Sequence, residues 1–246
     1  LKQHTAYIKI NRPPNNFFDA ALIESIADIL DDLDKEIMCR SIILYSEGKN
    51  FCAGADFSKS NFIEGQNIYE NLYKQALRIF KSSKPIIAII QGAAIGGGLG
   101  LALSADFRVA CPEARFSANF AKLGFHPGFG SSVTLPRVVG QQYAMDMLFT
   151  ARRVGGEEAF KMGLADRLVS KDDLIATSEK LADEIASSAP MAVESIRATL
   201  RGNLAEQVEE IVDWELSEQV RLQKTEDFKS GIAASLTREI PKFNRK

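Results

Sequence analysis

The feature that most constrains this chain is the stretch KPIIAIIQGAAIGGGLGLALSAD, residues 84–106. A segment that is apolar at every position leads to three adjacent glycines and then to a second apolar segment without charge before Asp106. Strands apolar throughout are buried on both faces, as in the parallel sheets of α/β proteins. The stretch therefore predicts a buried parallel strand followed by a helix that begins at the glycines and ends near Ala105.

The remaining pattern alternates between strands and helices and then becomes mostly helical. Strands are predicted at Thr5–Ile10 and Ser41–Ser46, with a helix capped by Asp19 between them. A helix is expected over residues 67–82, after a loop at residues 58–66. Further helices are expected at residues 141–150, 157–162, 172–188 and 190–201, with two more within 205–236. This order predicts an α/β fold with a helical C-terminal region.

Length and charge limit the class of protein. The chain has 246 residues, 46% of them hydrophobic, enough for one large core. Its 30 basic and 32 acidic residues give a net charge of −2, so no overall field attracts nucleic acid or an anionic membrane. No apolar run approaches the roughly 20 residues that cross a bilayer. We expect no nucleic-acid partner and no membrane partner.

Cysteines and histidines are few and widely spaced. Cys39, Cys52 and Cys111 form no C-x-x-C pair, which favours reduced thiols and a cytoplasmic location. His4 and His126 are the only histidines, and neither has the spacing of a metal site with the cysteines. We therefore expect no metal.

The three glycines have two explanations. At a helix start the backbone N–H groups lack intrahelical partners, and glycine lets an anion or a developing oxyanion reach them. Alternatively, the glycines only permit tight packing of strand and helix. The spacings of phosphate-binding loops are absent.

A second stretch favours the first explanation. GKNFCAGAD, residues 48–56, places a turn after the strand Ser41–Ser46, at the sheet edge where α/β proteins bind ligands. One N–H from the region of Ala55 and one from the region of Gly97 would then form a two-donor oxyanion hole.

In these motifs the chain resembles the crotonase (enoyl-CoA hydratase/isomerase) superfamily. The resemblance rests on NFCAGAD and KPIIAIIQGAAIGGGLGLALSADFRVA, preceded by INRPPNNFF and followed by FSANFAKLGFHPGFGSSVTLPRVVG. It implies a spiral of repeated β-β-α units over residues 1–188 and a helical trimerisation region over 189–246. It also implies a homotrimer or homohexamer that acts on acyl-CoA thioesters, with no cofactor besides the coenzyme A of the substrate.

The resemblance also implies site residues. The amides of Ala55 and Gly97 match the oxyanion pair, and Gly98 is expected to contact the substrate. Lys59 lies near the position of a lysine that meets the CoA phosphates, although a solvated surface lysine is the simpler explanation. Asn15 lies in INRPPNNFF, in a loop that borders the adenine in the family and that is one residue shorter here than the usual pattern.

The chain departs from the family in its acids. The two glutamates of the hydratases match Gly100 and Phe120, and an aspartate of some isomerases matches Gly128. Phe120 and Gly128 are therefore expected to line the substrate pocket without titrating. General acid/base chemistry needs a titratable group near the proton, so the paired-glutamate route to hydration does not follow from the resemblance.

Two other residues are candidate proton carriers. His126 lies in the turn LGFHPGFG and has a suitable unperturbed pKa, but it could simply bond the turn backbone beside Pro127. Glu64 lies on the loop that covers the pocket in relatives, although a solvated glutamate is the ordinary explanation. Asp56 and Asp106 are expected to cap helices or brace loops.

The function therefore has two open forms. The first is an acyl-CoA enzyme of the hydratase/isomerase type that stabilises an enolate, with hydrolase or decarboxylase outcomes open. Decarboxylation is poorly supported, because the lysine and histidine of decarboxylating relatives match Glu64 and Gln219. The second is a CoA-ester-binding protein that no longer turns over its ligand.

Overall fold

The computed structural model of the protein describes residues 1–57 and 68–246. Its main sheet is wholly parallel, in the strand order β1-β2-β3-β5-β8. The strands are β1 (Thr5–Ile10), β2 (Ser41–Ser46), β3 (Ile86–Ile90), β5 (Phe107–Ala110) and β8 (Arg167–Leu168). Every residue of β3 is buried, as expected for a central strand covered on both faces.

A smaller sheet joins β4 (Ala93–Ile95), β6 (Arg115–Ser117) and β7 (Val154–Gly155). β4 pairs with β6 in parallel, and β6 pairs with β7 antiparallel. The chain passes from β3 to β4 through Gly92, where a Cβ atom would lie 2.0 Å from the carbonyl oxygen of Lys49. Only glycine fits this crossing, so it fixes where the small sheet starts relative to the first loop (residues 48–56).

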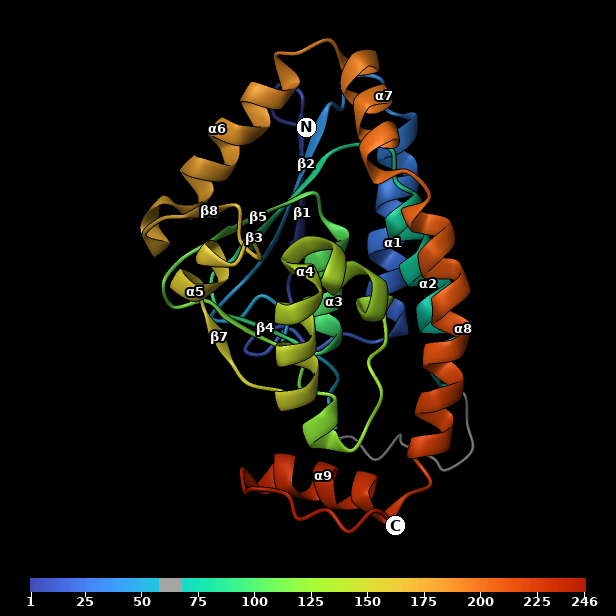
Figure 1. Cartoon of the computed structure of the whole chain (residues 1–246). Helices are drawn as coiled ribbons and strands as arrows, with labels where there is room; N and C mark the ends of the chain where they lie inside the picture. Colours follow the sequence, from blue (N-terminus) through green and yellow to red (C-terminus); the bar gives the residue numbers. More distant parts are fainter. Residues whose placement is uncertain (58–67) are drawn as a thin grey trace.

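Helices cover the main sheet on both sides, as Figure 1 shows. α1 (Ala20–Lys35) packs against α2 (Ile68–Lys81) on one side, and α6 (Leu174–Ala186) packs on β2, β3 and β5 on the other. α3 (Gly97–Ser104) is completely buried and packs against α4 (Ser131–Thr150). α5 (Gly156–Lys161) follows β7.

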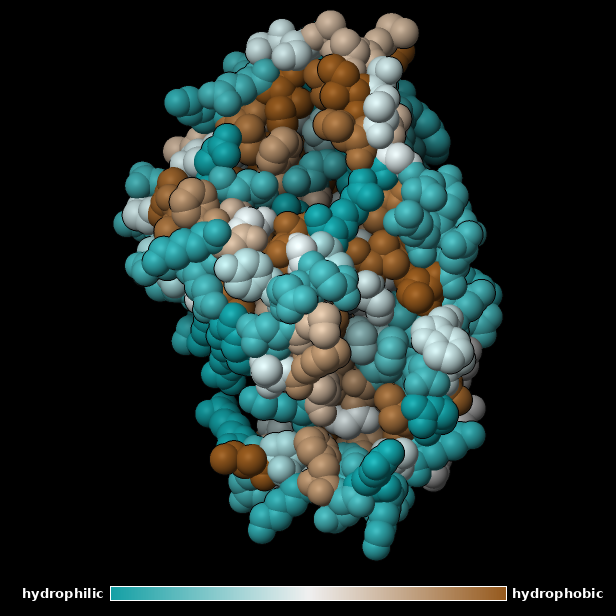
Figure 2. All heavy atoms as spheres, in the orientation of Figure 1, coloured by the Kyte–Doolittle hydropathy of each residue, from teal (hydrophilic) through white to brown (hydrophobic). Residues whose placement is uncertain are grey.

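The C-terminal helices differ in how deeply they are buried. α8 (Leu204–Leu222) adds buried residues to the main core and packs on α2 and α4, while α9 (Glu226–Thr237) packs near the short helix η1 (Ala121–Leu123). α7 (Pro190–Arg201) has no fully buried residue. The apolar side chains Met191, Ile196 and Leu200 of α7 are 83%, 58% and 72% exposed. Figure 2 shows apolar atoms gathered over α6 and α7.

Several predicted elements are confirmed. β1, β2 and α7 have the predicted bounds, α3 begins at the glycines, and Asp19 caps α1 by accepting from the amide of Leu22 at 2.9 Å. The helix predicted at residues 141–150 is longer, because α4 begins at Ser131. Pro136 and a left-handed Gly140 (φ 78°) interrupt its apolar period, which hides its first half from pattern analysis.

Asp106 ties α7 to the sheet. Its carboxylate accepts from the amide of Ile86 at 2.8 Å and pairs with Arg197 at 2.9 Å and Arg201 at 2.8 Å. Its side chain is only 16% exposed. The expectation that Asp106 braces the chain is therefore confirmed. The predicted boundary after residue 188 falls between α6 and α7, and whether it separates two domains stays a prediction.

We expect Asp106→Ala to lower the free energy of unfolding by roughly 3 to 5 kcal/mol, because two largely buried guanidinium groups, 9% and 14% exposed, lose their carboxylate partner. Urea denaturation measures the loss. Asp32→Ala is the matched control, since Asp32 is 80% exposed and, within the described part of the chain, pairs only with Lys35 in a surface bridge. Its change should stay within about 0.5 kcal/mol. Equal losses in the two variants would contradict the bracing role.

Candidate active site

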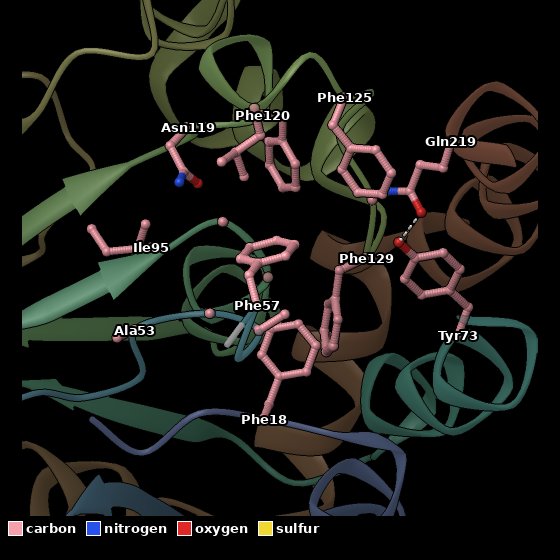
Figure 3. A pocket seen from close by; sticks show the side chains of 16 residues that line it. Phe18, Ala53, Phe57, Tyr73, Ile95, Asn119, Phe120, Phe125, Phe129 and Gln219 are labelled. Atoms are coloured by element: carbon pink, nitrogen blue, oxygen red, sulfur yellow. Dashed lines mark hydrogen bonds between the residues drawn. The ribbon is translucent and has the colours of Figure 1, made fainter. Parts of the chain in front are cut away.

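A small cavity lies where the first loop meets the glycine turn (residues 96–98), as Figure 3 shows. It has a volume of about 40 Å³. Its described lining is mostly apolar and comprises Phe18, Ala53, Gly54, Ala55, Phe57, Tyr73, Ile95, Gly96, Gly97, Asn119, Phe120, Leu123, Phe125, Gly128, Phe129 and Gln219. Segments far apart in the sequence thus converge on one cavity.

Phe18 holds the first loop and the glycine turn together. Its amide donates to the carbonyl of Gly54 at 3.1 Å, and its backbone forms a parallel bridge with Ala55. Its ring lies against Gly97, where a Cβ atom would be 2.2 Å from the ring. The same residue therefore fixes Ala55 through its backbone and Gly97 through its side chain.

The other glycines permit equally close contacts. A Cβ atom on Gly98 would lie 2.2 Å from the carbonyl oxygen of Cys52, and one on Gly54 would lie 2.9 Å from that of Ile95. Gly96 has φ 55°, a conformation that side chains rarely adopt, and its amide donates to Ser117 at 2.8 Å. Close packing of the backbone, the alternative explanation for the three glycines, is thus one reason for these residues.

Two amides stay available at this junction. Among the described residues, neither the N–H of Ala55 nor that of Gly97 donates to another protein group. Gly97 is the first residue of α3, so its amide has no intrahelical acceptor and lies at the positive end of the helix dipole. Both residues line the cavity. The arrangement can bind an anion or an oxygen on which negative charge develops.

The positions matched to the family's acids are filled by other groups. A Cβ atom on Gly100 would lie 2.8 Å from the Cβ of Phe129, which is 1% exposed. A Cβ atom on Gly128 would lie 1.9 Å from the hydroxyl of Tyr73. The ring of Phe120 lines the cavity itself. A carboxylate at Gly100 or Gly128 would not fit without movement of these aromatic residues.

The structure brings some predicted site residues together and not others. Ala55, Gly97, Phe120 and Gly128 line the cavity, whereas Gly98 is buried beside Cys52. Lys59 and Glu64 lie outside the described residues.

His126 and Asn15 lie next to the cavity. The Nδ1 of His126 donates to the carbonyl of Pro127 at 2.9 Å, and the ring is not among the described lining groups. Asn15 lines a neighbouring groove, and its carbonyl accepts from Ala53 at 3.0 Å. The role of each as a site residue stays a prediction.

That neighbouring groove is larger and basic. It has a volume of about 1080 Å³ and shares Ile95, Asn119 and Leu123 with the cavity. Its basic lining residues are Lys49, Arg115, Lys122, Arg152, Arg153 and Arg238, against the single acid Glu239 among those described. The Nε of Arg115 is buried without a hydrogen-bond partner. The groove offers local positive charge that the balanced net charge of the chain conceals.

No described residue that lines the cavity offers a reactive thiol or a metal-binding side chain. Cys52 is fully buried, and burial raises the pKa of its thiol to about 12, so it stays protonated. In residues 1–57 and 68–246, no cluster of three or more His, Cys, Asp or Glu could hold a metal ion. In the same ranges no helix is long and apolar enough to cross a membrane.

Sequence comparison decides the family. The family model for enoyl-CoA hydratase/isomerase matches residues 1–246. The chain belongs to this family, within the crotonase superfamily. It is 32% identical to a probable enoyl-CoA hydratase of Bacillus subtilis, over 99% of this chain and 96% of that protein. It is 31% identical to a short-chain-enoyl-CoA hydratase of Clostridium acetobutylicum, over 98% of this chain and 95% of that protein.

Solved structures agree with the predicted fold. The enoyl-CoA hydratase/isomerase of Pseudoalteromonas atlantica matches with a TM-score of 0.89 and 30% identity, covering 99% of this chain and 98% of that chain. The predicted crotonase-like α/β fold is therefore confirmed. The sequence pattern did not predict Tyr73 and Phe129 as cavity residues. Each has the pattern of an ordinary buried aromatic residue, and only the fold brings it to the cavity.

A buried carboxylate supports the cavity from α8. Glu215 is fully buried and accepts from the amides of Gly130 and Ser132 at 2.8 and 3.0 Å and from the hydroxyl of Ser132 at 2.6 Å. It thereby caps the start of α4, directly after Phe129. Burial raises the pKa of Glu215 to about 7, outweighing the hydrogen bonds that lower it.

This shift predicts a pH dependence of stability. The pKa of Glu215 is higher in the folded chain than in the unfolded chain, so its contribution is fully present below about pH 4.5 and is lost as the pH rises through about 7. Glu215→Gln cannot ionise. The unfolding free energy of the unchanged protein minus that of Glu215→Gln should fall by roughly 2 to 3 kcal/mol from pH 5 to pH 8. Urea denaturation across that range measures it, and a difference independent of pH would contradict the raised pKa.

Proposed function

We propose that the protein acts on acyl thioesters of coenzyme A and stabilises the enolate formed from the thioester carbonyl. The amides of Ala55 and Gly97 would donate to that oxygen as it gains negative charge. The observation that carries the proposal is that two residues whose amides have no acceptor among the described residues line one apolar cavity and are fixed by the same residue, Phe18.

The physical contribution of such a pair is large. Donors held in place in a site that excludes water stabilise developing charge without having to reorganise. Losing one donor of this kind costs about 100-fold to 1000-fold in rate. The proposal requires no cofactor besides the coenzyme A of the substrate, and no metal takes part in it.

The proposed chemistry is not the paired-glutamate addition of water. By the sequence resemblance, Gly100 and Phe120 match the positions where that route has its carboxylates, which supports this proposal. Isomerisation, hydrolysis and decarboxylation all pass through charge on the thioester oxygen and stay compatible with the two amides. His126 and Glu64 are the candidate proton carriers, and the one whose alanine variant loses proton exchange is assigned the role.

The basic groove supports coenzyme A as the carrier. Phosphates need local positive charge in a chain of net charge −2, and the groove supplies it beside the acyl cavity. We propose that Lys59 adds to this charge and that Asn15, which lines the groove, borders the adenine.

We propose a cytoplasmic homotrimer or homohexamer. The exposed apolar face of α7 supports this proposal, because Met191, Ile196 and Leu200 are exposed on it, and Ile196 and Leu200 line a groove of about 430 Å³ between α7 and the core.

The test is α-proton exchange. Incubation with a panel of acyl-CoA thioesters in deuterium oxide should give α-deuterium uptake, followed by mass spectrometry. Gly97→Pro removes one amide at the first residue of α3, the helix position that best tolerates proline, and should slow uptake about 100-fold to 1000-fold relative to Gly97→Ala.

Gly97→Ala is the matched control. It keeps the amide but adds the same Cβ atom against Phe18, so its rate gives the cost of the collision alone. Equal rates in the two variants would contradict the role of the Gly97 amide. Tight binding of acyl-CoA without exchange or product would instead establish the second candidate, a binding protein without turnover.

A further inference from the structure

A carboxamide without a hydrogen-bond partner lies where the cavity meets the basic groove. Among the described residues, Ile95, Asn119 and Leu123 line both hollows, and we call these three residues the neck. Asn119 is the only polar member of the neck, and it is half-buried. Within residues 1–57 and 68–246 its carboxamide neither donates nor accepts a hydrogen bond, and its atoms are not sealed from solvent. It is therefore available to a ligand that passes through the neck.

The glycine turn fixes where this carboxamide lies. A Cβ atom on Gly96 would be 3.0 Å from the Oδ1 of Asn119, so this oxygen lies over the turn. Gly96 directly precedes Gly97, whose amide is one of the two proposed oxyanion donors. Figure 3 shows Asn119, Ile95 and Ala53 together on one side of the cavity. The oxygen of Asn119 thus lies beside the oxyanion site, on the side that leads to the basic groove.

A thioester of coenzyme A has to pass through the neck if its parts bind as proposed. Its acyl group would lie in the cavity and its phosphates in the basic groove, so the pantetheine arm would connect the two. The first polar group of this arm after the sulfur is the secondary amide of the cysteamine unit. Its N–H precedes its carbonyl along the arm, so the N–H is the donor nearest to the thioester.

The neck offers this N–H one side-chain acceptor. Ile95 and Leu123 are apolar, so Asn119 is the only side chain of the neck that can replace the water lost by the cysteamine amide on binding. A donor or acceptor that loses water without gaining a partner weakens binding. The carboxamide oxygen and the N–H each need a partner in the bound state, and each can supply it to the other.

We propose that the Oδ1 of Asn119 accepts a hydrogen bond from the cysteamine N–H of the bound thioester. Asn119 then determines specificity for the thiol arm of the substrate, and it helps to hold the thioester oxygen at the two amides. This inference rests on the proposed function and adds a residue to it. A site built to bond an N–H rejects the analogue that lacks it, because the acceptor of the site is left without a partner.

The experiment compares two truncated thioesters that differ only in this donor. Both carry the acyl group whose CoA thioester takes up α-deuterium fastest in the panel above. One is the thioester of N-acetylcysteamine, and the other is the thioester of mercaptoethyl acetate, in which an ester oxygen replaces the N–H. The acyl group and the thioester are the same, so the intrinsic acidity of the α-protons is the same. Deuterium uptake, followed by mass spectrometry, gives kcat/KM for each.

We expect the unchanged protein to prefer the amide thioester by at least about fivefold in kcat/KM. The ester analogue leaves Oδ1 of Asn119 without a donor and places a second oxygen against it. Equal values of kcat/KM for the two thioesters would overturn the proposal. So would the absence of uptake from the amide thioester under conditions in which the corresponding CoA thioester exchanges.

Variants then assign the preference to Asn119. Asn119→Leu replaces the carboxamide with an apolar group of similar shape and should bring the two values to within about twofold of each other. Asn119→Asp keeps an acceptor oxygen and should keep the preference for the amide, although the added charge slows uptake from both thioesters. Asn71→Leu makes the apolar change on an exposed residue of α2 and should leave the preference unchanged.

A preference that survives Asn119→Leu in a folded protein would overturn the role of Asn119. If that variant does not fold, the comparison within the unchanged protein and the result for Asn119→Asp stay decisive. The two proposals fail in distinguishable ways. If CoA thioesters exchange their α-protons but the N–H has no effect, the proposed function stands and the role of Asn119 is wrong. If no CoA thioester binds or exchanges, the proposed function itself is wrong.

Discussion

The site depends on a close approach of two backbone segments that side chains would prevent. Gly97 lies against the ring of Phe18, Gly98 against the carbonyl of Cys52, and Gly54 against that of Ile95. These contacts bring the first loop and the glycine turn together at the ends of neighbouring strands. Among the described residues, the amides of Ala55 and Gly97 have no backbone acceptor, and both residues line the cavity.

Under the proposed function, this scaffold would separate the binding of an oxyanion from the movement of protons. The donors belong to the backbone, so they persist whatever side chains line the cavity. Gly100, Phe120 and Gly128 are the residues that the sequence resemblance matches to the family's acids, and the space beside Gly100 and Gly128 is filled by Phe129 and Tyr73. Under the proposed function, the chain would keep the part of the site common to all reactions of a thioester enolate and change the part that selects among them.

The sequence predicted what depends on local pattern. The fully apolar segment predicted β3, the cap at Asp19 predicted the start of α1, and the glycines predicted the start of α3. The short strands β4 to β8 were missed, since two to four residues have no recognisable period. Tyr73 was missed because its neighbours in the cavity come from α8 and the turn at Gly128, which only tertiary packing brings together.

The central claim is that paired amides hold the thioester oxygen. A crystal structure of the protein with a bound, non-reactive acyl-CoA analogue tests it directly. The account predicts that the thioester oxygen lies about 2.7 to 3.1 Å from both the amide nitrogen of Ala55 and that of Gly97. A thioester oxygen in contact with neither amide, in a cavity that is otherwise occupied by the acyl group, would contradict it.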